Sequence, residues 1–306
     1  MALFLLVLVA ISGCRLFDRD SPSEMDADLD MKDPMTRANF GLLGVEFFES
    51  GNNAKRWNIN SNYAEIHRSE NYVFLKTVAA DFHAERTGNV IHTLSDQGRS
   101  ALDKNQVDLS GNVKIKARTG YEFAMNTLVY DGEAHAFRSN DEVLMQGPQS
   151  TRPSMILRGT GLVGDIDREH FILRYRVTAR KRFRGDDWLK VKSQQGEFFT
   201  EEQHAIFEGK VTTHLPSGLA VESDVMDLTS TQDREIMEAR GTVTMLFKEK
   251  RGWAQNAYFE AGGDRIILEG NAKVESKRSE VRGRRITLFT MDDRVEVSEA
   301  EGRVQN

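Results

Sequence analysis

Cysteine is nearly absent from this chain of 306 residues, which contains a single one at position 14. No disulfide can form within the chain, so a domain of this size must be held by its hydrophobic core and its backbone hydrogen bonds. Prolines number only five. A basic excess is missing as well, because the net charge is −6 and both signs are interspersed. A phosphate-binding surface for nucleic acid would normally show such an excess, so we expect no nucleic-acid partner.

The sequence also offers few candidates for a metal site, a catalytic site or a phosphate-binding loop. The seven histidines are scattered along the chain, and no third ligand clusters with any pair of them. We therefore expect no metal and no cofactor. No pair of catalytic carboxylates can be picked out, and "RGTGLVGD" (158–165) lacks the Lys-Ser/Thr of a phosphate loop, which favours a turn or a bulge there. The sequence does not predict an enzyme.

An apolar run of twelve residues lies at 2–13. It is too short to span a bilayer comfortably, but it suits the core of a signal peptide. The following "Ile11-Ser12-Gly13-Cys14" resembles the bacterial lipobox, although no Lys or Arg precedes the run. We expect 1–13 to be a lipoprotein signal peptide and Cys14 to be lipidated, with enough acyl chains for stable anchoring. The alternative is a buried or incidental cysteine.

The next segment is acidic, and the remainder of the chain has a strand pattern. Residues 17–34 hold seven acids and two bases, which predicts a disordered acidic tether over 14–37. A weaker alternative is that this segment docks on a basic partner surface. From about Ala38 onward, runs with period-2 alternation predict strands of five to nine residues, and no long amphipathic helix is evident. The fold class is all-β.

Glycine recurs on what the alternation marks as the apolar face of these strands. In "ILEGNAKV" the apolar positions are Leu268, Gly270, Ala272 and Val274. The same placement gives a set of predicted inward glycines: Gly111, Gly209, Gly241, Gly270 and Gly302. Successive spacings of 32, 29 and 32 residues from position 209 to position 302 indicate a repeat of about 31 residues. Such copies would share one continuous interior, although bulge or curvature glycines in a packed sandwich are the alternative.

Two parts of the chain resemble known families of lipopolysaccharide transport. The C-terminal part is similar to the OstA/LptA-type domain, through a motif that is carried by Leu268, Gly270, Asn271, Ala272, Val274, Gly283, Arg284, Ile286, Leu288, Asp293, Arg294 and Val297. The upstream part, with "GVEFFESGNNAKRWNINSNYAEIH" and "VDLSGNVKIKARTGYEFAMNTLVYD", is similar to LptC. One departure is the lipobox, where LptC generally has a transmembrane helix.

The resemblance implies an open-ended β-jellyroll of stacked antiparallel strands whose apolar interior carries lipopolysaccharide acyl chains. It implies an LptC-like module over 38–184 and an OstA/LptA-like module over 185–306, which could share one continuous sheet. The candidate groove-lining residues are Val113, Ile115, Phe123, Val211, Val221, Met245, Phe247, Leu268 and Val274.

The same resemblance implies the protein's surroundings. The implied partners are lipopolysaccharide, the inner-membrane ABC transporter of the Lpt system, and LptA-like or outer-membrane LptD-like domains that join by edge-strand addition. The implied place is the periplasm, with the lipidated Cys14 in the inner membrane rather than the outer one. An alternative function is a cell-envelope β-solenoid lipoprotein that binds polysaccharide or has a structural role.

Overall fold

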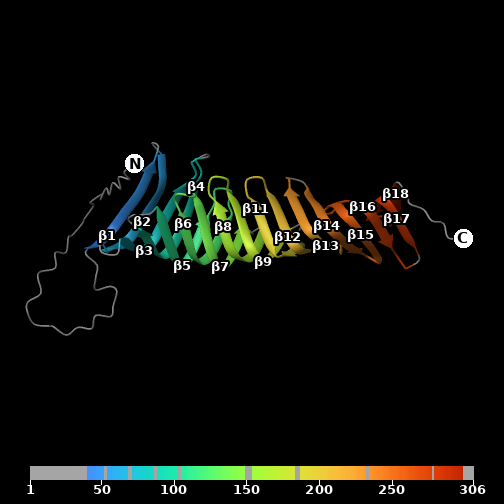
Figure 1. Cartoon of the computed structure of the whole chain (residues 1–306), viewed down its shortest axis with the longest axis horizontal. Coiled ribbons are helices and arrows are strands. Elements are labelled where there is room, and N and C mark those ends of the chain that lie inside the picture. The colour runs from blue at the N-terminus through green and yellow to red at the C-terminus, as the bar shows by residue number, and fades with distance from the viewer. Residues whose placement is uncertain are drawn as a thin grey trace, which may run out of the picture. The chain divides into compact units, whose positions relative to one another are not determined.

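The computed structural model describes residues 40–51, 54–67, 71–85, 88–101, 105–148, 154–182, 187–231, 234–277 and 279–298. Every regular element in these residues is a β-strand, which confirms the all-β prediction (Figure 1). The signal peptide, Cys14, the acidic tether and Gly302 lie outside the described residues. The strands are β1 (Phe40–Gly51), β2 (Ala54–His67), β3 (Tyr72–His83), β4 (Val90–Ala101), β5 (Gln106–Lys116), β6 (Glu122–Asp131), β7 (Ala136–Gly147), β8 (Met155–Asp165), β9 (His170–Arg182), β10 (Trp188–Ser193), β11 (Gln195–Phe199), β12 (His204–His214), β13 (Ala220–Ser230), β14 (Glu235–Phe247), β15 (Lys250–Glu260), β16 (Arg265–Glu275), β17 (Glu280–Phe289) and β18 (Val295–Ser298).

The strands form two compact units. Unit 1 comprises the chain up to Arg118 together with Ala124–Ser139, and unit 2 comprises Thr119–Phe123 together with the chain from Asn140 onward. Strands β1–β5 thus belong to unit 1 and β8–β18 to unit 2, while β6 and β7 contribute to both. The predicted module boundary at 184/185 lies within unit 2, between β9 and β10, which are hydrogen-bonded to each other. It stays a prediction about sequence modules.

Neighbouring strands in the sequence are antiparallel neighbours in space. In unit 1 the pairing runs from β1 to β5 without interruption. In unit 2 it runs from β8 to β9 and from β12 to β18. Strands β10 and β11 both pair with β9 and β12, so together they act as one strand that is interrupted at Gln194. This serial order is visible along the colour gradient of Figure 1.

Most strands are longer than the predicted five to nine residues, and that expectation was wrong. Strand β9, for example, has 13 residues and β14 also has 13. Each long strand continues through a bend, where the register shifts, as between Glu208 and Val211 in β12. Two residues with left-handed backbone form this bend, Gly209 (φ 79°) and Lys210 (φ 49°). A β-bulge of this kind bends a strand without ending it.

The bends divide unit 2 into two half-sheets. The first half-sheet contains β10 together with the parts of β13 up to Ser223 and of β14 from Val243 onward, with the equivalent parts of the other strands. The second contains β11 together with the opposite parts of the same strands. Their inner faces contact each other, because a Cβ on Gly252 of the first half-sheet would lie 2.8 Å from Leu268 Cδ1 of the second. The core of unit 2 therefore lies between the half-sheets.

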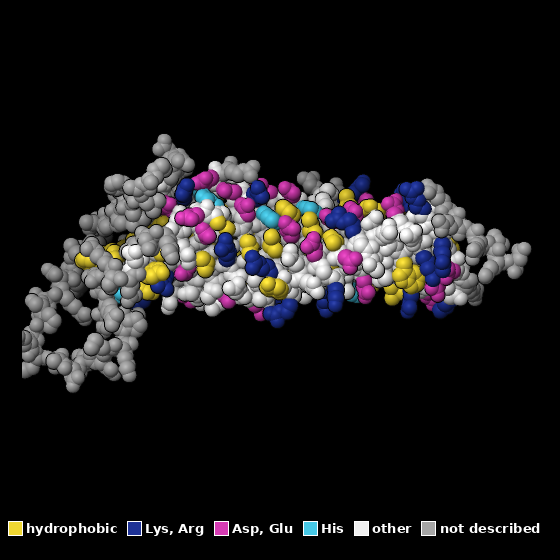
Figure 2. Space-filling view, viewed as in Figure 1, with side chains coloured by type: hydrophobic (Ala, Val, Ile, Leu, Met, Phe, Trp, Pro, Cys, Tyr) yellow, Lys and Arg dark blue, Asp and Glu magenta, His cyan; other side chains and the backbone are white. Residues whose placement is uncertain are grey.

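Alternation of side chains along each strand separates the core from the solvent. Strand β13 shows the pattern clearly: over Ala220–Asp224, buried side chains alternate with more exposed ones at every second residue. Charged side chains of both signs lie on the surface that Figure 2 shows, among smaller patches of apolar side chains. Such a surface suits an aqueous compartment, while the inner rows supply the hydrophobic core.

Candidate functional site

The nine predicted groove residues all lie in the interior of their units. Their exposed fractions run from 0% for Val113 to 4% for Met245 and Phe247. Cross-strand pairing brings three of them together, because Val221 is in register with Met245, and Met245 with Gly252, which is in register with Val274. This inner row crosses four strands of the first half-sheet. Leu268 faces it from the second half-sheet, where its Cδ1 would meet a Cβ on Gly252.

The remaining predicted groove residues are not all joined to this row by cross-strand register. Val113 and Ile115 belong to β5 of unit 1, and Ile115 is in register with the buried Thr93. Phe123 packs against Phe171 with ring centroids 4.6 Å apart. Around all nine residues the interior is filled by side chains, so the structure shows a packed core at these positions. Their contact with lipid is a proposal that depends on that core opening.

The predicted inward glycines require a correction. Four of them (Gly111, Gly209, Gly241 and Gly270) have positive φ angles and lie at the bends of their strands. A Cβ on Gly241 would meet the side chain of Asp224, and one on Gly111 would meet that of Asp96, and both of these carboxylates are exposed. The glycines therefore point toward polar side chains on the outer face. Of the two alternatives, the bulge glycine is the one that the structure shows.

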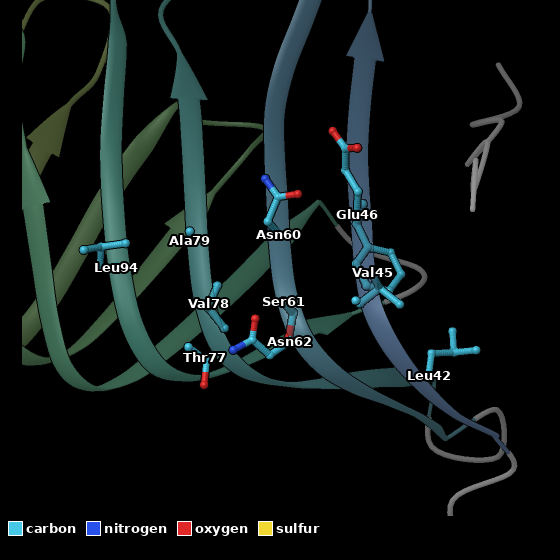
Figure 3. A pocket seen from close by; sticks show the side chains of 12 residues that line it. Leu42, Val45, Glu46, Asn60, Ser61, Asn62, Thr77, Val78, Ala79 and Leu94 are labelled. Carbon is cyan, nitrogen blue, oxygen red and sulfur yellow. The ribbon is translucent and has the colours of Figure 1, made fainter. Parts of the chain in front are cut away.

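Open space occurs instead in unit 1, beside the bends of β1–β4. A cavity of about 460 Å³ is lined there by Leu42, Gly44, Val45, Glu46, Phe47, Asn60, Ser61, Asn62, Thr77, Val78, Ala79 and Leu94 (Figure 3). Its volume lies within the usual range for small-molecule sites. Two of its walls, Val45 and Val78, are buried, whereas Leu94 is 55% exposed. The cavity thus extends from the solvent to buried side chains of unit 1 at the bend.

Sequence reasoning missed this cavity. Val45 and Phe47 stand in "GVEFFES", whose alternation correctly predicts a strand, but alternation alone does not show where neighbouring side chains leave a gap. The exposed Leu94 offered one signal, because it interrupts the polar face of β4 at a position that alternation assigns to the outside. An exposed leucine in isolation is common on protein surfaces, so that signal is weak.

Polar side chains close the edge of unit 2 where strand ends of the two half-sheets meet, and we call this edge the rim. Lys181, at the end of β9 in the first half-sheet, donates a hydrogen bond to Ser230 Oγ in the second. Its Nζ also lies 2.9 Å from Glu235 Oε2, and Ser230 Oγ donates to that same oxygen at 2.6 Å. Since β9 does not pair with β13 or β14, these contacts bridge the half-sheets.

Tyr121 lies beside this cluster. Burial raises the pKa of its phenol to about 12, and the Glu235 carboxylate contributes to the same shift. Tyr121 therefore lies in a poorly solvated environment, in which the neutral phenol is the stable form.

A second bridge on the rim is exposed. Lys248 follows β14, and its Nζ lies 2.9 Å from Asp293 Oδ1 in the turn that follows β17. The Lys248 and Lys250 ammonium groups hold the pKa of Asp293 below its ordinary value.

Farther along unit 2, the buried Glu169 accepts hydrogen bonds from the hydroxyls of Thr119 and Thr200.

Unit 1 has a comparable polar contact. The indole Nε1 of Trp57 donates to Glu49 Oε2 at 2.6 Å and to Asn105 Oδ1 at 3.1 Å. Asn105 Nδ2 donates in turn to Glu49 Oε1 at 3.0 Å. Glu49 and Trp57 are both buried, so each polar atom in this contact is satisfied within the protein.

Neither metal ligands nor membrane helices are found in the part of the chain that the structure describes. No group of three His, Cys, Asp or Glu side chains in those residues is placed to hold a metal ion. In the same residues, no helical segment has the length and apolar character that a membrane span requires.

Comparisons with known proteins find matches for both parts of the chain. Residues 5–182 match the family model "Lipopolysaccharide-assembly, LptC-related", and residues 190–294 match the model "LptA/(LptD N-terminal domain) LPS transport protein". Among solved structures, one match is LptH from Pseudomonas aeruginosa, described as the LptA homologous periplasmic component of the lipopolysaccharide transport device. It is 17% identical, with a TM-score of 0.35, over 37% of this chain and 84% of LptH. None of the curated proteins compared with the chain matches it.

Proposed function

The chain belongs to the LptC-related lipopolysaccharide-assembly family and functions in the lipopolysaccharide transport bridge, and we propose that it conducts the lipid along the inner rows of its two units. The observation that carries this proposal is the inner row of Val221, Met245, Gly252 and Val274, which passes from strand to strand without a polar side chain. The row crosses the strands, so its direction is the direction in which the strands are stacked. An acyl chain along it would contact one strand after another.

The energetics of such a path suit transport. An acyl chain gains about 0.8 kcal/mol for each CH₂ that leaves water. That gain does not depend on direction, so a chain can shift by one strand with little change in free energy. The packed core at these residues means that lipid displaces side chains when it enters. Met245 and Phe247, each 4% exposed, could change position to make room for lipid. The flexible thioether side chain of Met245 is particularly suited to this.

The family match favours transport over the alternative of a polysaccharide-binding lipoprotein. We propose that the outer edges of β1 and β18 accept strands from neighbouring LptA-like or LptD-like domains. Strand β1 is hydrogen-bonded along β2, and β18 along β17, and each is the terminal strand of the described chain. Edge strands of this kind are suited to β-augmentation.

Proteins of this family are periplasmic, and the finer location is part of the proposal. We propose that Cys14 is lipidated and holds the chain at the inner membrane, where the Lpt ABC transporter supplies lipopolysaccharide. We also propose that ATP hydrolysis takes place in that transporter and that this chain is passive. Separation of inner and outer membranes, followed by immunodetection of the full chain, tests the anchor. A Cys14→Ser variant that remains in the same membrane fraction would contradict lipidation at this residue.

A photo-crosslinking experiment tests lipid conduction. A photoreactive amino acid at Val221 or Met245 should capture lipopolysaccharide in cells, because both side chains lie on the inner row. The matched controls are Glu222 and Thr244, which are in register with each other one residue farther along the same two strands and lie on the outer face. Equal capture at inner and outer positions, or none at any of the four, would overturn the proposal.

A further inference from the structure

Lys181, Ser230 and Glu235 occupy positions that the strand alternation assigns to the interior. In β9 the buried residues Val177 and Ala179 precede Lys181 at two-residue steps, and in β14 the buried Met237 follows Glu235 in the same way. The side chains of Lys181 and Glu235 are 15% and 16% exposed. An ion pair on an inner face costs desolvation of both charges, and a pair of apolar side chains there would usually be as stable or more so. The stability of the fold therefore does not account for these charges.

Beneath the ion pair, apolar side chains lie together with the polar Thr200, Gln203 and His204. A space of about 10 Å³ next to the ion pair is lined by the buried side chains of Tyr121, Met145, Met155, Phe198 and Leu228, among others. That volume is at the lower limit of what one water molecule needs, so the space holds no lipid chain in the present arrangement. It is narrow in the present arrangement, and it would widen if Lys181 and Glu235 separated, since the pair bridges the two half-sheets.

A cation above an apolar interior matches one class of ligand. An amphiphile with acyl chains between the half-sheets must hold its polar headgroup at the rim, where the strand ends face the solvent. A phosphate in that headgroup would meet the Lys181 ammonium, which donates strong charge-assisted hydrogen bonds to phosphate oxygens. Glu235 can release the lysine without becoming an isolated ion, because Ser230 Oγ still donates to it at 2.6 Å.

We propose that Lys181 is a binding residue for the phosphate of the lipid headgroup, and that Glu235 holds it in a closed bridge when no lipid is present. This inference rests on the proposed function. The ligand chemistry is an acyl lipid that carries a phosphate monoester. Binding exchanges the carboxylate partner of Lys181 for a phosphate, and the two half-sheets part at this point of the rim.

The test uses the full chain and two probes, lipid A with its phosphates and the same lipid after enzymatic removal of the phosphates. Retention of each radiolabelled lipid on the immobilised protein is measured for wild type, Lys181→Met and Glu235→Gln. We expect Lys181→Met to lose about tenfold in retention of the phosphorylated lipid, the effect of one charge-assisted hydrogen bond, with no loss for the dephosphorylated lipid. Glu235→Gln should increase retention of both lipids, because it weakens the closed bridge, and the increase should be larger for the phosphorylated lipid, because the Lys181 ammonium then has no competing carboxylate. Lys192→Met, on the outer face of β10, is the matched control.

The outcomes separate this inference from the proposed function. A wild-type protein that retains both lipids, with Lys181→Met unchanged or reduced equally for both, would overturn the role of Lys181 while lipid conduction stands. A wild-type protein that retains neither lipid would overturn both. Addition of 10 mM inorganic phosphate should leave the phosphorylated lipid bound, since the acyl chains supply most of the affinity. If free phosphate instead displaces it as completely as Lys181→Met does, the site binds inorganic phosphate and the inference is wrong.

Discussion

The bend of β14 at Gly241 allows a test of the correction for the inward glycines. Gly241 has φ +95°, and an alanine there would place its Cβ 2.7 Å from the Cβ of Asp224. Asp224 cannot retreat without cost, because its Oδ2 accepts a hydrogen bond from the backbone amide of Thr242 at 2.8 Å. Gly241→Ala should therefore add two penalties, a left-handed backbone for alanine and the displacement of Asp224. If the glycine faced the interior, the new methyl would touch core side chains and Asp224 would be unaffected.

Gly218 supplies the matched control. It has φ +86°, and a Cβ at this position would have no atom within 4 Å. Gly218→Ala thus carries only the backbone penalty, about 1 kcal/mol for an L-residue in the left-handed region. For Gly241→Ala we expect a loss of about 2–3 kcal/mol in the free energy of unfolding, because the hydrogen bond from the Thr242 amide to the Asp224 carboxylate is also weakened. The loss is not larger because this hydrogen bond is exposed, and solvent reduces its contribution to stability. At about 2–4 °C for each kcal/mol, the midpoints of thermal unfolding should fall by about 2–4 °C and about 4–12 °C respectively.

The assay is thermal unfolding of the full chain by far-ultraviolet circular dichroism at pH 7. A double-mutant cycle with Asp224→Gly isolates the contact, because that change removes every side-chain atom that the new methyl meets. In the Asp224→Gly background, Gly241→Ala should cost no more than Gly218→Ala does. An equal fall for Gly241→Ala and Gly218→Ala in the wild-type background, or simple additivity in the cycle, would refute the outward orientation of Gly241.

Alternation predicted the interior well and the bends poorly, for one physical reason. In β12 the buried Phe207 and Val211 are four residues apart, so a two-residue repeat continued through Gly209 assigns that glycine to the inner face. The bend consists of two left-handed residues, Gly209 and Lys210, and therefore preserves the inner position of Val211 while Gly209 itself turns outward. The two-residue alternation of the sequence cannot reveal this bend. A bulge of two residues leaves the inner and outer positions after it in the same alternation as before it.

The rim was beyond sequence reasoning for another reason. Lys181 and Glu235 belong to strands that do not pair with each other, and they meet only because the bends bring the two half-sheets face to face. The family motif carries the repeat but gives no distance between strand ends. A charged residue in an inner position was the available signal, and Lys181 stands within a run of basic residues that favours a solvated surface as the simpler explanation.

Three further results follow from particular side chains. Phe82 is fully buried in unit 1, with its ring centroid 4.3 Å from that of Tyr130. Phe82→Ala should cost about 3–5 kcal/mol in urea unfolding, whereas Tyr175→Ala, at a position 60% exposed, should stay within about 0.5 kcal/mol. The raised pKa of Tyr121, about 12, means that the unfolded chain loses this proton at lower pH than the folded chain does. Stability should thus decline between about pH 10, the ordinary value, and pH 12, and Tyr121→Phe should flatten that decline in unfolding midpoints and remove the last step of the tyrosinate absorbance titration. Asp293 gives the opposite sign, because its pKa in the folded chain is lowered by Lys248 first and by Lys250 second. Its pairing is complete above about pH 4 and is lost as the pH falls through the lowered pKa. Lys248→Met should move the carboxyl titration of Asp293, followed by ¹³C NMR, upward toward its ordinary value, and high salt should do the same in the wild type because the pair is exposed. An unchanged titration in Lys248→Met would mean that this lysine does not bridge the rim in solution.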